Sequence, residues 1–286
     1  MSESSSTPPE PATGTDSALL FPASFAQQRL WFLHKLIPDS PAYNIAMARL
    51  LTGPLNTAAL QNALNQLLER HETLRTRFTS IDDEPMQVVA ESATLLIDTD
   101  TLEQVDDETD DNSLRQKINA LSAAPFDLEN ESLLRISLFS STTNNSEQAD
   151  HLLVIVIHHI IADAWSLDIL FRELVQLYNS ECQNELIELP ELPIQYGDYA
   201  DWQLEQVDSG TQQQQLEYWR NQLANAPAVL DLPTDRARPG LQSYNGDTLY
   251  RELSTELSSQ VQAFAKQSGS TYFVVMLAAY SALLSR

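Results

Sequence analysis

The sequence has very little cysteine and few basic residues. Its one cysteine, Cys182, cannot form an internal disulfide, which fits a reducing compartment. We interpret this residue as a buried or bystander thiol. The sequence has 16 lysines and arginines and 40 aspartates and glutamates, which gives a formal net charge of −24. This balance excludes nucleic-acid binding through a basic surface, and it suits solubility and docking to a partner with a basic patch.

Long hydrophobic runs are also missing. No stretch approaches the length of a membrane-spanning helix, and the N-terminus has neither the basic start nor the apolar centre of a signal peptide. The sequence therefore predicts a cytoplasmic protein without a membrane partner. Its 286 residues, of which 43% are hydrophobic, are enough for one large domain or two medium ones, each with a core.

The most informative stretch is an aliphatic run followed by two histidines. Residues 152–157 predict a strand buried on both faces. Because side chains alternate along a strand, His158 and His159 are expected to point to opposite sides of the sheet, which argues against a shared metal site. Ser166 is predicted to N-cap a following helix with one apolar face. An imidazole held above such a strand-to-helix turn is typical of acid–base chemistry.

Before this stretch the pattern alternates between helix and strand. Residues 1–18 hold almost nothing apolar and are expected to form a disordered leader. Ser24 is predicted to cap a short helix, and a strand is expected over residues 43–50. A clear amphipathic helix begins near Thr57. His71 lies in its apolar stripe, so we interpret it as a hydrogen-bonded packing residue, with the lining of a site as the alternative.

An acidic stretch follows this helix. Twelve acidic residues and no basic ones lie between Arg77 and Arg115, which predicts strands joined by a solvated, mobile acidic loop. The spacing of a calcium-binding loop is not present, so no metal site is predicted. Another strand is expected over residues 133–139, followed by a polar loop to Gln148. The predicted fold class is mixed α/β (α+β), with long helices covering a sheet.

The last third of the sequence predicts mainly helices. A helical stretch is expected over residues 196–223, and a proline-punctuated segment at 230–239 is the predicted domain boundary. A strand over 248–253 and helices over 255–267 and 271–284 follow.

Four motifs occur in order along the chain. They are SFAQQRLWFL at 24–33, RHETLRTRF at 70–78, HHIIADAWS at 158–166 and YGDYADWQ at 196–203. Together they resemble the condensation domains of nonribosomal peptide synthetases, and the third corresponds to the family's HHxxxDG signature. The first and third look most like the subtype that joins an L-configured donor to an L-configured acceptor.

This resemblance implies a fold and a reaction. Condensation domains are similar to chloramphenicol acetyltransferase, a two-layer sandwich repeated in two halves that form a V with a tunnel between them. Residues 19–229 would form the N-terminal subdomain and 230–286 the start of an incomplete C-terminal subdomain. The implied reaction forms an amide bond between a carrier-tethered acyl or peptidyl thioester and the α-amine of a carrier-tethered aminoacyl thioester.

The resemblance also implies partners. These are donor and acceptor peptidyl carrier proteins and an adjacent adenylation domain. Phosphopantetheine is supplied on the carrier proteins, and no cofactor is bound directly.

The third motif supplies the implied site residues. His159 is expected to face the tunnel, as a general base or as a hydrogen-bond acceptor that orients the amine, while His158 is expected to be structural. Asp163 is expected to hold the turn. If it is buried it needs a cationic partner, for which Arg75 is preferred and Arg70 is the alternative.

Other residues of these motifs are expected to support the site. Trp165 is interpreted as a core or wall residue, and Tyr199 and Trp202 as packing at the tunnel's flank or the domain seam. Ala164 stands where the family has glycine, and it would be strained there only if the backbone needs a positive φ.

Other functions remain open at the sequence level. Because the family's later motifs are missing, the chain is expected to carry the catalytic histidine without a complete active site and to expose apolar surface. One alternative is therefore an inactive condensation-like fragment that docks carrier proteins or neighbouring domains. The others are another HxxxD acyltransferase or an epimerisation domain of the same fold.

Overall fold

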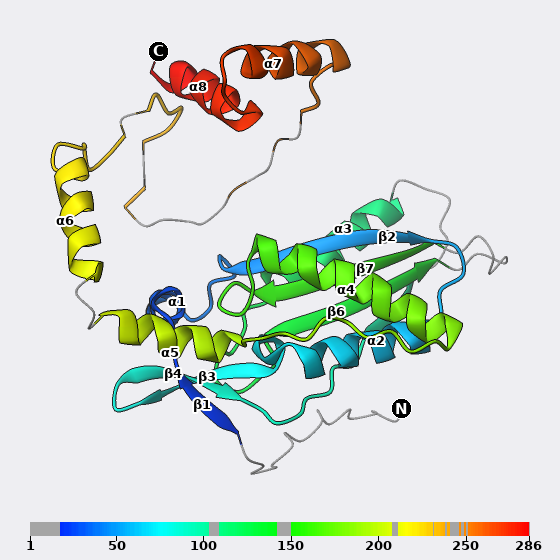
Figure 1. The fold of residues 1–286 in the computed structure, drawn as a ribbon. Coiled ribbons are helices and arrows are strands. Elements are labelled where there is room, and N and C mark those ends of the chain that lie inside the picture. Colours follow the sequence, from blue (N-terminus) through cyan, green and yellow to red (C-terminus); the bar gives the residue numbers. More distant parts are fainter. Residues whose placement is uncertain are drawn as a thin grey trace. The chain divides into compact units, whose positions relative to one another are not determined.

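A computed structural model shows how the chain folds (Figure 1). It describes residues 18–102, 109–141, 150–207, 211–230, 232–237, 239–240, 246, 249 and 251–285. Two compact units make up the chain, Met1–Leu216 and Glu217–Arg286. Residues 1–17 of the expected leader, 106–108 of the acidic loop and most of the polar loop before Gln148 lie outside the described residues.

The described residues of the first unit form two β-sheets. The larger sheet has the strand order β2-β7-β6-β5, and β7 pairs antiparallel with both of its neighbours whereas β5 and β6 are parallel. Its strands are β2 (Asn44–Thr52), β5 (Asp98–Leu102), β6 (Leu134–Ser141) and β7 (Asp150–His158). The smaller sheet is antiparallel in the order β1-β4-β3. Its strands are β1 (Leu19–Pro22), β3 (Thr76–Ile81) and β4 (Glu84–Val89).

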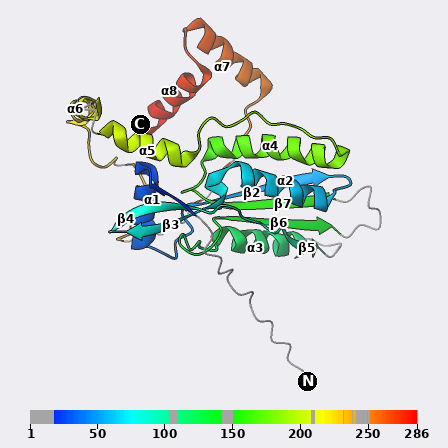
Figure 2. The same cartoon turned by 60° about the horizontal axis from the view of Figure 1, so that its bottom comes forward.

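Helices cover both faces of the larger sheet. Figure 2 shows α2 (Thr57–Arg70) and α4 (Ala164–Gln183) side by side on one face and α3 (Thr109–Ala123) on the other. The first unit also contains α1 (Phe25–Leu36), the 3-10 helix η1 (Glu72–Arg75), α5 (Tyr196–Val207) and the start of α6 (Thr211–Leu223). The second unit contains α7 (Thr255–Gln267) and α8 (Tyr272–Leu284). No helix in the described part of the chain is long and apolar enough to cross a membrane.

The core of the first unit forms around β7. Residues 153–157 are each at most 2% exposed, which confirms the predicted strand buried on both faces. The apolar faces of α2 and α4 pack against it, with Leu64 and Leu67 of α2 and Leu170 and Leu174 of α4 in the same cluster. Burial of these faces, at about 25 cal/mol per Å² of apolar surface, holds the helices on the sheet.

Several sequence predictions are confirmed. The Ser24 hydroxyl accepts a hydrogen bond from the Gln27 amide, and the Gln27 side chain accepts one from the Ser24 amide, so α1 begins with a capping box. The helices α2, α7 and α8 begin within one residue of the predicted positions.

Other predictions were wrong. The helix α3 begins within the acidic stretch before Arg115 that was read as strands and a loop, and its Leu114, Ile118 and Leu121 pack against the core. The described residues of the expected strand at 248–253 are 249 and 251–253, and they have no strand structure. The cap of α4 is Asp163, with Ser166 inside the helix at its third position. Cys182 is exposed, which excludes the buried alternative for this thiol and leaves the bystander one.

Candidate active site

The two histidines lie where β7 ends. The His158 amide donates to the Leu133 carbonyl (3.0 Å) and the His159 amide to the Tyr43 carbonyl (2.8 Å), so the backbone of both is fixed from opposite sides. Their side chains then diverge, with His158 only 4% exposed and His159 exposed. The opposite orientations expected from strand alternation are therefore confirmed.

His158 is enclosed by aromatic side chains. Its ring lies edge-on to Phe126, with ring centres 6.0 Å apart, and 6.5 Å from Tyr43. Its Nδ1 atom accepts a hydrogen bond from the Ile160 amide (3.1 Å). Burial, with smaller effects of His34 and His159, lowers the pKa of His158 to about 4. A neutral imidazole that braces the turn after β7 has the features of a structural residue.

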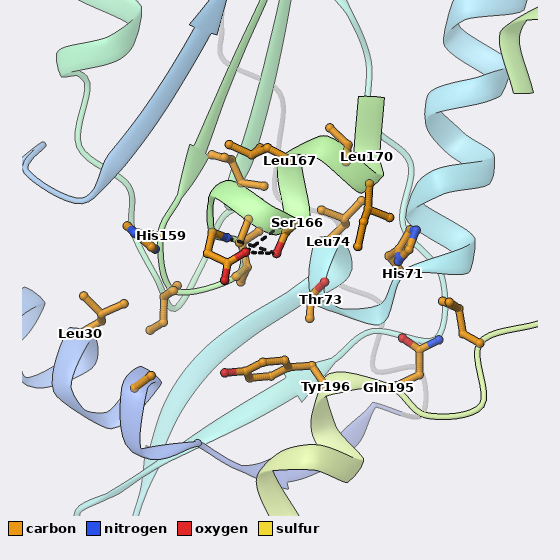
Figure 3. Close-up of a pocket in the computed structure, with 18 of the residues that line it drawn as sticks. Leu30, His71, Thr73, Leu74, His159, Ser166, Leu167, Leu170, Gln195 and Tyr196 are labelled. Atoms are coloured by element: carbon orange, nitrogen blue, oxygen red, sulfur yellow. Dashed lines mark hydrogen bonds between the residues drawn. The ribbon is translucent and has the colours of Figure 1, made fainter. Parts of the chain in front are cut away.

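His159 faces a cavity of about 420 Å³. Most of the lining is aliphatic and comes from α1, η1, the turn after β7, and α4, as Figure 3 shows with Leu30, Leu74, Leu167 and Leu170. The polar lining residues on the turn and α4 are His159, Asp163 and Ser166. A pocket of this size, mainly apolar with a few polar groups, is typical of a small-molecule or substrate site.

Asp163 fixes the turn that carries His159. Its Oδ1 atom accepts hydrogen bonds from the Ser166 amide (2.8 Å) and hydroxyl (2.6 Å), and it caps α4. These bonds are the main reason that the pKa of Asp163 is lowered, and the charge of His159 lowers it further. Asp163 is exposed, so it does not need the cationic partner that was expected for a buried aspartate.

The two candidate arginines have other partners. Arg75 donates to the carbonyl of Ala90 (2.8 Å) and lies 3.7 Å from the Glu72 carboxylate. Arg70 pairs through Nε with Glu173 of α4 (3.1 Å). A pairing of Asp163 with an arginine was expected only if the aspartate were buried, and the exposed Asp163 caps α4 instead.

The cavity also has residues that sequence reasoning did not select. Thr73, Gln195 and Tyr196 line it together with His71. Tyr196 opens the YGDYADWQ motif, so a signal was present, but it was not read as part of the site. His71 hydrogen-bonds through Nε2 to Glu173 (2.7 Å), which confirms it as a hydrogen-bonded residue that also lines the site.

Four motif residues, Ala164, Trp165, Tyr199 and Trp202, lie outside the cavity lining. Ala164 is the first residue of α4, and positive φ angles at non-glycine residues of the described part occur elsewhere, so alanine causes no strain there. Trp165 is 77% exposed, which excludes the core alternative of its interpretation as a core or wall residue. Trp202 is 54% exposed and stacks at 5.9 Å on the half-buried Tyr199. In the described ranges, no group of three or more His, Cys, Asp or Glu side chains could hold a metal ion.

Comparison with known proteins identifies relatives of this chain and of its fold. A family model described as Condensation domain matches residues 19–286. A linear gramicidin synthase protein of Brevibacillus parabrevis is 38% identical over 265 residues, which cover 93% of this chain and 5% of that protein. Phosphinothricin tripeptide synthetase PhsC of Streptomyces viridochromogenes is 37% identical over 265 residues, 93% of this chain and 24% of that protein.

Solved structures share the fold. The first condensation domain of the CDA synthetase superimposes with a TM-score of 0.75 at 19% identity, over 94% of this chain and 63% of that one. A four-domain nonribosomal peptide synthetase bound to AMP and glycine gives a TM-score of 0.76 at 24% identity, over 94% of this chain and 20% of that one. These likenesses confirm the expected mixed α/β fold of the chloramphenicol acetyltransferase type.

The chain thus spans a small part of the curated relatives and at most about two thirds of these solved chains. The family model and the relatives agree over nearly all of its residues. The chain belongs to the condensation-domain family of nonribosomal peptide synthetases.

Proposed function

We propose that the full-length protein joins a carrier-tethered acyl or peptidyl thioester to the α-amine of a carrier-tethered aminoacyl thioester, with His159 at the reacting amine. One observation carries the proposal. The His159 side chain is exposed to a mainly aliphatic cavity, while its backbone is fixed by the Tyr43 carbonyl and its turn by the Asp163 cap.

The reaction needs only a weak base from the protein. The amine nitrogen attacks the thioester carbonyl, an N–C bond forms, the C–S bond breaks, and one proton passes from nitrogen to the leaving thiolate. A free α-amine has a pKa of about 8, so a weak base is enough to supply the neutral nucleophile. His159 either takes that proton or accepts a hydrogen bond that orients the amine.

Positioning would supply much of the rate. Two tethered substrates held beside His159 react as neighbours, which replaces a bimolecular encounter by an intramolecular one. The aliphatic walls, which include Leu30, Leu167 and Leu170, would limit the access of water to the thioester. Asp163 acts as a positioning residue, because it caps α4 and so fixes the turn between His159 and the helix.

The same proposal names the partners. Donor and acceptor carrier proteins would bring the phosphopantetheine thioesters, an adenylation domain would load the acceptor, and the chain itself would bind no cofactor. The matched relatives are large synthetases, which supports such partners. We place the reaction in the cytoplasm, where carrier proteins are loaded.

An amide-forming assay tests the proposal. The full-length protein is mixed with an acyl-loaded donor carrier and an aminoacyl-loaded acceptor carrier, and the mass of the acceptor carrier is followed. We expect the acceptor to gain the acyl mass with the wild type and not with His159→Ala. Equal product with both proteins would refute the role of His159.

A further inference from the structure

The cavity has a second polar end that the proposed reaction does not use. Figure 3 shows His71 on the opposite side of the cavity from His159, and Thr73 belongs to the same 3-10 helix region as His71. Aliphatic side chains such as Leu74 and Leu170 line the space along with them. A few polar groups in a mainly apolar pocket typically recognise single features of a ligand.

His71 is held by a buried carboxylate. Its Nε2 atom lies 2.7 Å from Oε2 of Glu173, which is only 7% exposed and also pairs with Arg70 at 3.1 Å. A carboxylate paired with arginine only accepts hydrogen bonds, so His71 Nε2 carries the hydrogen and donates it. The other ring nitrogen, Nδ1, has no partner among the described residues, and it is the atom left for a ligand.

Some of the neighbouring polar side chains already have hydrogen-bond partners within the protein, and others do not. The Gln195 side chain accepts from the Glu72 amide (3.2 Å) and donates to the Arg70 carbonyl (3.0 Å), so both its ends are used. The Tyr196 hydroxyl is paired with Ser24 (3.0 Å). The Thr73 hydroxyl has no hydrogen bond to any residue that the structure describes. His71 Nδ1 and the Thr73 hydroxyl are therefore the groups at this end that can bind a ligand.

We propose that His71 and Thr73 form a hydrogen-bonding subsite for the far end of a substrate acyl chain. The inference rests on the proposed function, because that function makes pantetheine thioesters the ligands. The matching acyl chain is apolar along its length, to pack against the aliphatic walls, and ends in a hydroxyl or primary amide. Burying that terminal hydroxyl or amide without a hydrogen-bond partner would cost binding free energy. His71 Nδ1 and the Thr73 hydroxyl oxygen can each accept a hydrogen bond from it. Glu173 is the positioning residue of the subsite.

Binding of unreactive analogues tests the subsite. The probes are acyl-pantetheine amides of increasing chain length, each made with a terminal hydroxyl and with the isosteric terminal methyl. Calorimetry with the full-length protein should show, at the chain length that spans the cavity, about tenfold tighter binding of the hydroxyl compound. Thr73→Val, which conserves shape, and His71→Phe should each remove most of this preference.

Matched substitutions outside the cavity lining are the controls. Thr79→Val on β3 and His151→Phe on β7 make the same chemical changes and should keep the tenfold preference. Thermal melts followed by circular dichroism check that each variant folds. If His71→Phe does not fold, the binding data for Thr73→Val alone decide whether the subsite exists. The proposal is overturned if no pair is distinguished at any length, if neither member of any pair binds, or if the controls lose the preference equally.

The subsite and the proposed function can fail separately. The analogues contain an amide in place of the thioester, so their binding does not depend on turnover. Amide formation that is unaffected by His159→Ala would refute the proposed function while leaving the binding preference intact. Loss of the preference with normal His159-dependent turnover would refute the subsite alone.

Discussion

Acid should destabilise the first unit through His158. This imidazole is 4% exposed, and its pKa is lowered from 6.5 to about 4, so the folded protein keeps it neutral where the unfolded chain protonates it. Its contribution to stability is therefore complete above pH 6.5 and is lost as the pH falls toward 4. The full loss corresponds to about 3 kcal/mol of unfolding free energy, of which about 2 kcal/mol falls between pH 7 and pH 5.

Urea unfolding of the wild type and His158→Asn at both pH values isolates this effect. The asparagine side chain can still accept from the Ile160 amide but does not titrate. Other groups contribute equally to both proteins, so the wild type should lose about 2 kcal/mol more than the variant between pH 7 and pH 5. If the wild type and His158→Asn lose the same unfolding free energy between pH 7 and pH 5, with unchanged denaturant slopes, the reasoning that burial keeps His158 neutral is refuted.

Five other substitutions, at four positions, test the local geometry by urea unfolding. Asp163→Ala should cost about 1 kcal/mol and Asp163→Asn much less, because asparagine also caps helices; equal costs would contradict the cap. Ala164→Gly should leave amide formation unchanged and cost at most about 1 kcal/mol, since the backbone there is helical; a gain in activity would contradict this. Gly197→Ala places a methyl group 2.7 Å from the Phe21 ring and should cost about 1–3 kcal/mol, whereas Gly240→Ala, with open space around it, should be neutral.

The sequence predicted the parts of the site that depend on local pattern. Residues 153–157 are all aliphatic, so a strand formed by them has no polar face to expose and is buried on both sides. Because side chains alternate along the strand, His158 and His159 lie in opposite environments. The Ser24 cap was predicted for the same reason, because Ser24 and the Gln27 amide that donates to its hydroxyl are three residues apart.

Features that depend on tertiary context were not predicted. The helix α3 begins in an acidic stretch, and only the spacing of Leu114, Ile118 and Leu121 indicated that it has an apolar face. The pairing of Arg70 with Glu173 joins residues 103 positions apart, and no local pattern specifies it. The apolar neighbours of Asp163 left open whether it is buried and needs a cationic partner, and the structure shows an exposed helix cap that needs none.

The most direct test of the account is the single-turnover rate of amide formation by His159→Ala, measured beside its affinity for both carrier proteins. The full-length protein is used with saturating donor and acceptor carriers. We predict a rate about a hundredfold or more below that of the wild type, with carrier affinity unchanged, because the substitution removes a proton acceptor without changing the surface that docks the carriers. An unchanged rate, or the absence of product from the wild type while the carriers still bind, would contradict the account and favour a docking module.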